Sequence, residues 1–140
     1  MSTVPVGVLA NLLLRVYTDR ELTGSDLYTF GQPVDAADEV DIGVLHVDGH
    51  PTDYLGDFRP GADCVALGLV SGGWMAPLDS TVAPSAHHDA LRVLQVFVIG
   101  RDGGIASQVR LPDGSVRDMG ADVVGRVPAA LRAALRRSAA

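Results

Sequence analysis

The segment His46-Val47-Asp48-Gly49-His50 holds the side chains best suited to chemistry. If a strand runs through it, the two-residue period of a strand places His46, Asp48 and His50 on one face. Two imidazoles and one carboxylate are the ligands of a facial triad or of a three-ligand catalytic zinc site. One hypothesis is therefore a metal-dependent hydrolase or oxygenase with a divalent metal ion as cofactor, to which His87 or His88 could contribute.

A structural interpretation competes with this metal site. Asp48-Gly49 is a turn dipeptide that would break the alternation, and Pro51 follows at once. His and Asp side chains then act as caps and turn residues. We favour this interpretation, and our leading hypothesis includes no cofactor.

Other catalytic classes lack essential residues. The 11 basic residues are all arginine, and without lysine there is no Schiff base, no pyridoxal phosphate anchor and no Walker-type phosphate loop. Ser71 lacks the glycine two residues earlier that a nucleophile elbow requires, since residue 69 is leucine. The single cysteine, Cys64, lies in an apolar run and is typical of a small buried hydrophobe. We predict no catalytic residue.

Trp74 and its neighbours Gly72 and Gly73 are the candidate binding residues. Tryptophan is enriched at binding hot spots, and glycine lets another chain approach closely. Packing in the core is the alternative role for Trp74, because the chain has few other large side chains.

Charge is unevenly distributed along the chain. The net charge is −6, with eight acids and one arginine in residues 35–63, and four arginines and no acid in residues 126–140. This predicts a contact between the two regions within a chain or head-to-tail between subunits, unless both are simply solvated faces. The negative total makes nucleic acid an unlikely partner. No apolar run reaches 18 residues, so we expect a soluble cytoplasmic protein with no membrane contact.

The periodicity predicts one α+β domain over residues 1–140. Leu9, Leu12, Leu13, Val16 and Tyr17 form one apolar helical stripe within residues 4–20. Residues 25–39 look irregular and 71–90 look like a long loop. Strands are expected at 40–47, 64–70, 91–99, 105–111 and 115–119, with a short helical turn at 52–58. Turns are expected at Asp102-Gly103-Gly104 and Pro112-Asp113-Gly114.

The last element expected is a C-terminal helix, whose apolar stripe is Val124, Val127, Leu131 and Leu135. The expected fold is an antiparallel sheet of about four or five strands with the N-terminal and C-terminal helices packed on one face.

Several short segments together resemble a known group of proteins. They are His50-Pro51, Leu55-Gly56-Asp57-Phe58, the stretch from Gly68 to Trp74, Arg101-Asp102-Gly103, and Gly125-Arg126-Val127-Pro128 with Leu131-Arg132. The set resembles small uncharacterised proteins of GC-rich, actinobacterial-type genomes, a domain of unknown function, over about residues 50–137. The resemblance implies a type of scaffold, and it carries over neither an activity nor a catalytic residue.

The leading hypothesis is a non-enzymatic module that binds a protein or a small ligand and forms a homodimer. The absence of a complete catalytic motif, the high apolar content and the exposed edges of the expected meander favour it.

Overall fold

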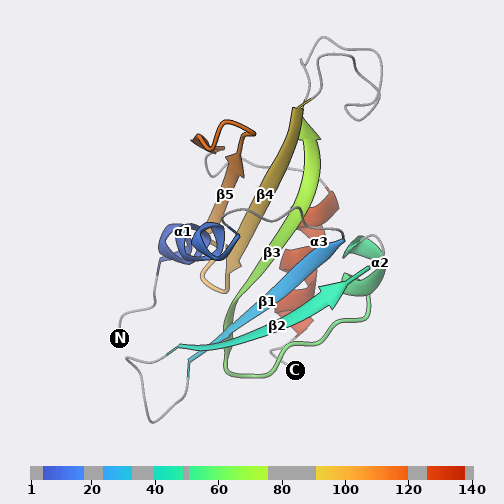
Figure 1. Ribbon diagram of the computed structural model, residues 1–140. Coiled ribbons are helices and arrows are strands. Elements are labelled where there is room, and N and C mark those ends of the chain that lie inside the picture. Colours follow the sequence, from blue (N-terminus) through green and yellow to red (C-terminus); the bar gives the residue numbers. More distant parts are fainter. Residues whose placement is uncertain are drawn as a thin grey trace.

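The computed structural model describes residues 5–17, 24–32, 40–48, 51–75, 91–119 and 126–137. The helices in these ranges are α1 (Val6–Val16), α2 (Pro51–Leu55) and α3 (Arg126–Arg137). The strands are β1 (Ser25–Gly31), β2 (Asp41–Val47), β3 (Cys64–Met75), β4 (Leu91–Gly100), β5 (Ile105–Arg110) and β6 (Val116–Asp118). They form one antiparallel sheet in the order β2-β1-β3-β4-β5-β6 (Figure 1). No helix in the described ranges has the length and apolarity needed to span a membrane.

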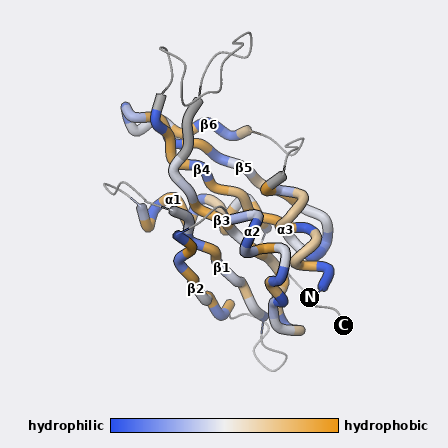
Figure 2. The backbone as a smooth tube through the Cα atoms, turned by 90° about the vertical axis from the view of Figure 1, so that its right-hand side faces the viewer, coloured by the Kyte–Doolittle hydropathy of each residue, from blue (hydrophilic) through white to orange (hydrophobic). Residues whose placement is uncertain are grey.

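The predicted α+β class is confirmed, but the placement of both helices on one face is wrong. On β3, Ala66 and Val70 pack in the cluster that includes α1, whereas Leu67 and Leu69 pack in the cluster that includes α3. The two helices therefore cover opposite faces of the sheet (Figures 1 and 2). The physical reason is that β3 and β4 are apolar on both faces, so each face needs a cover.

The sheet has six strands in the described residues, rather than four or five. β1 occupies part of the segment expected to be irregular, and β3 runs on into the segment expected to be a loop. β1 lies between β2 and β3, where Leu27 and Phe30 are buried on opposite faces. Asp26 of β1 is of a type that is uncommon in strands, and its carboxylate is hydrogen-bonded by Tyr17 and His46. Local sequence patterns do not indicate these contacts, because the partners come from other elements.

The α1 helix buries only part of its predicted stripe. It begins after Pro5, whose carbonyl oxygen accepts a hydrogen bond from the Val8 N–H at 3.0 Å. Leu9, Leu13 and Tyr17 are buried as predicted, but Leu12 and Val16 are exposed. Their exposure leaves apolar area on the outer side of the helix.

α3 is confirmed, with Leu131 and Leu135 buried, and it packs against α2. Arg137 donates to backbone carbonyls at the end of α2: its Nε lies 3.1 Å from the oxygen of Phe58, and its Nη2 bonds to the oxygen of Leu55. The basic C-terminal region thus meets the acidic region through backbone carbonyl groups at and just after the end of α2.

Candidate functional site

The outer side of α1, and the side of the edge strand β2 that faces the same way, expose large apolar side chains that we call the α1–β2 face. Their exposed fractions are 54% for Val8, 42% for Leu12, 54% for Val16, 51% for Ile42 and 62% for Val44. Ile42 and Val44 stand opposite Phe30 and Tyr28 in the β1–β2 register. Because Phe30 and Tyr28 pack in the α1 cluster, Ile42 and Val44 project on the same side of the sheet as α1.

Contacts with the sheet set the rotation of α1. The Asn11 Oδ1 accepts a hydrogen bond from Gln108 Nε2 at 2.8 Å, and the Leu14 oxygen accepts one from Arg110 Nη1 at 3.2 Å. With these residues turned toward β5, the i, i+4, i+8 series Val8, Leu12 and Val16 points away from the sheet. The apolar stripe is therefore exposed by the way the helix docks.

β2 is an edge strand without the usual protection. Its residues from Asp41 to His46 are all exposed, and it contains no proline, lysine or arginine. Its charged side chains, Asp41 and His46, stand near its two ends, so its middle residues carry no charge. Its register with β1 runs without a bulge. The opposite edge, β6, is only three residues long and carries Arg117 and Asp118, as protected edges do. Among the described strands, β2 is the edge most open to pairing.

A hydrogen-bonded network ties this region together at Asp26. Its Oδ1 lies 2.7 Å from His46 Nδ1, and its Oδ2 accepts a hydrogen bond from the Tyr17 hydroxyl. The Tyr17 and Tyr28 hydroxyl oxygens are 2.5 Å apart. Because Tyr17 has one hydroxyl proton and gives it to Asp26, Tyr28 must donate to Tyr17. One carboxylate thus connects α1, β1 and β2.

Two groups of the network have perturbed pKa values. Burial, together with the hydrogen bond to Asp26, raises the pKa of Tyr17 far above its usual range, so this hydroxyl stays protonated. The hydrogen bond from His46 to Asp26 raises the pKa of the exposed imidazole, and a smaller contribution comes from Asp48. The network therefore favours a cationic His46 between two carboxylates.

His46 Nε2 lies 3.0 Å from Asp48 Oδ1, although β2 ends at Val47 and Asp48 lies in the bend that follows it. Both ring nitrogens of His46 are thus engaged by carboxylates. No three His, Cys, Asp or Glu side chains among the described residues lie close enough to hold a metal ion. His50, His87 and His88 lie outside the described residues, so the metal site stays a prediction.

The predicted binding residues Gly72, Gly73 and Trp74 are in β3 and not in a loop. They pair with Leu94, Val93 and Arg92 of β4, beyond the point where the β1–β3 pairing ends at Ser71. The side chain of Trp74 lies outside the described part of the structure, so its binding role stays a prediction. Cys64 is buried as expected, and burial raises the pKa of its thiol.

The sequence interpretation missed both the Asp26 network and the α1–β2 face. Nothing local to Asp26 indicates its partners, which come from other elements. The sequence did contain an indication of the α1–β2 face, because Val8, Leu12 and Val16 extend the apolar side of α1 around most of the helix. A helix that is apolar nearly all round needs a second surface to cover it.

Comparisons of the chain with protein-family models, with curated proteins and with solved structures returned no match. The function that we assign to the α1–β2 face therefore follows from its own residues.

Proposed function

We propose that this protein is a non-enzymatic interaction module that forms a homodimer through the α1–β2 face. The observation that carries the proposal is β2, an exposed edge strand without proline or bulge whose middle residues, from Ile42 to Leu45, include large apolar side chains and carry no charge. Such a strand offers unpaired backbone N–H and C=O groups to another strand, and natural proteins rarely leave one uncovered.

The sequence of β2 suits pairing with a second copy of itself. An antiparallel pair of β2 strands centred on Val44 sets Val44 against its own counterpart. On the other face, Leu45 of each copy then stands over Gly43 of the other. A large side chain over a glycine, repeated twice about the axis, is what a two-fold symmetric contact requires.

The stripe on α1 offers further apolar area on the same side of the sheet. Val8, Leu12 and Val16 are on the same side of the sheet as Val44. Covering their exposed area contributes about 25 cal/mol for each Å² of apolar surface removed from water. Strand pairing gives the dimer its register, and the stripe adds apolar area.

The test is the particle mass of the wild type and of Val44→Lys in analytical ultracentrifugation. A lysine at Val44 puts a charge in the middle of the contact and protects the edge, so we expect the wild type to be a dimer and the variant a monomer. Val116→Lys is the matched control, because Val116 is also an exposed valine on an edge strand. This control should remain a dimer.

A wild type that stays monomeric at about 0.5 mM would exclude even a contact of about −5 kcal/mol and overturn the proposal. Equal dimerisation of the wild type and Val44→Lys would place the interface elsewhere, and that result also contradicts it.

A second candidate function is a metal-dependent hydrolase or oxygenase using His46, Asp48 and His50. The short His46–Asp48 distance favours it, although a metal ion at Nε2 would have to displace the hydrogen bond to Asp48. Elemental analysis of protein purified without an affinity tag tests this function. Less than about 0.2 metal ion per chain, with melting unchanged by a chelator, would exclude it.

A further inference from the structure

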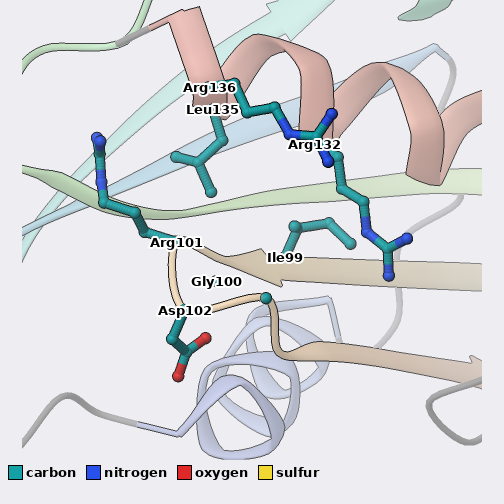
Figure 3. A pocket seen from close by; sticks show the side chains of 8 residues that line it. Ile99, Gly100, Arg101, Asp102, Arg132, Leu135 and Arg136 are labelled. Atoms are coloured by element: carbon teal, nitrogen blue, oxygen red, sulfur yellow. The ribbon is translucent and has the colours of Figure 1, made fainter. Parts of the chain in front are cut away.

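A pocket of about 590 Å³ lies between α3 and the turn that joins β4 to β5. We call it the arginine groove, and its lining includes Ile99, Arg101, Asp102, Arg132, Leu135 and Arg136. Figure 3 shows Arg132 and Arg136 extending from α3, Arg101 on the facing turn with its side chain directed away from them, and the side chains of Ile99 and Leu135 in between. The groove thus combines three guanidinium groups with an apolar base.

The groove is positive in a chain of net charge −6. Its single acid, Asp102, is engaged in the turn itself, where Oδ1 accepts a hydrogen bond from the Gly104 N–H at 2.9 Å. In Figure 3 the Asp102 side chain points away from the three arginine side chains. The carboxylate in the lining therefore does not neutralise the guanidinium groups.

Arg101 is held in place before any ligand arrives. Its Nε and Nη2 donate to the Cys64 carbonyl oxygen at 2.8 and 2.6 Å, and its backbone N–H donates to Val65 at 2.8 Å. A side chain fixed in this way loses little conformational freedom on binding.

Arg132 and Arg136 are placed one helical turn apart, where like charges repel. Neither forms an ion pair with a carboxylate within the described part of the chain. The helix dipole favours cations at the C-terminal end of α3, but it does not account for Arg101 on the facing turn. A bound anion would relieve the repulsion between the two arginines of the helix.

We propose that the arginine groove binds a small, multiply charged oxyanion, such as the phosphate or carboxylate groups of a metabolite. Guanidinium groups donate paired hydrogen bonds to these groups, and the strength of such bonds grows in a partly enclosed site. The apolar base accepts the carbon part of the ligand. The groove lies on the α3 side of the sheet, so this proposal is independent of the α1–β2 face.

The test is titration calorimetry with pyrophosphate and with citrate, at constant ionic strength set with chloride. We expect saturable binding of one molecule per chain for at least one probe. The double variant Arg132→Gln/Arg136→Gln should weaken it about tenfold or more, because two charge-assisted contacts are lost. Binding of pyrophosphate alone would assign the ligand to phosphate compounds, and binding of citrate alone to polycarboxylates.

The matched control is Arg59→Gln/Arg117→Gln, which removes two exposed arginines elsewhere and should bind within about twofold of the wild type. Methyl resonances of Ile99 and Leu135 should also shift when the probe is added to the wild type, a measurement that needs no variant. The proposal is wrong if neither probe saturates, if both double variants lose affinity equally, or if the methyl resonances do not move.

Discussion

Asp26 is the residue at which the polar contacts of three elements meet. It accepts hydrogen bonds from Tyr17 at the end of α1 and from His46 on β2. Tyr17 is almost fully buried, so its bond to Asp26 acts in a medium of low dielectric constant and resists competition from water. His46 is largely exposed, and its ion pair contributes less.

We expect the contribution of His46 to stability to depend on pH. Its pKa is raised above the ordinary value of 6.5, mainly by the hydrogen bond to Asp26. The protonated imidazole is therefore the stabilising form. Its contribution is complete below pH 6.5 and is lost as the pH rises through the raised pKa.

Urea unfolding of the wild type and of His46→Gln checks this dependence. The difference in midpoint should be larger near pH 6 than near pH 9, where both proteins lack the charge. An NMR titration that places the His46 pKa at or below 6.5 would contradict the prediction.

At the scale of elements, the docking of α1 depends on Gly68 in the middle of β3. A Cβ atom at this position would lie 2.9 Å from Leu13 Cδ1 and 3.2 Å from Phe30 Cε2. The glycine is thus needed for the close approach of the helix.

We predict that Gly68→Ala destabilises the protein by about 1–3 kcal/mol, because the added methyl group overpacks the contact between α1 and the sheet. Gly7→Ala is the control, since a Cβ atom at Gly7 meets nothing within 4 Å. Gly7 lies within α1, and the replacement should stabilise the helix by about 0.5–1 kcal/mol. Chemical denaturation measures both, and equal effects of the two substitutions would contradict this account of Gly68.

At the scale of the whole molecule, the two faces of the sheet differ in charge and in the helices that cover them. On one side, α1 packs mainly against β4 and β5 and leaves Ile42 and Val44 of β2 exposed. On the other side, α2 and α3 pack together, and the arginine groove lies at the edge of α3. A protein surface and a small anion could therefore bind at separate places.

Arg137 connects α3 with the end of α2, and removing its side chain should destabilise the packing of these two helices. We expect Arg137→Ala to lower the free energy of unfolding by about 1–2 kcal/mol, because two carbonyl groups at the end of α2 lose a charged donor. Arg136→Ala is the neighbouring control, an exposed arginine whose loss should change stability by about 0.5 kcal/mol or less. Denaturant titrations in buffer free of phosphate and citrate compare the two variants. Equal losses in their free energies of unfolding would contradict the role that we assign to Arg137.

Several features could be predicted from the sequence because they depend on neighbouring residues. The C-terminal helix follows from the spacing of Leu131 and Leu135, and both turns of the meander follow from their glycines. Gly103 and Gly114 adopt the positive φ angles that such turns require. The His46–Asp48 contact is also local, because the two residues are only two positions apart.

The candidate site depended on contacts between distant parts of the chain. Residues 25–39 were expected to be irregular, and the strand β1 within them is tied to other elements through Asp26, whose carboxylate is bonded by Tyr17 and His46. Leu12 and Val16 look like core residues until the docking of α1 turns them outward. Local patterns determined the type and extent of many elements. Only the tertiary structure decided which faces are covered, because burial depends on what lies opposite each side chain.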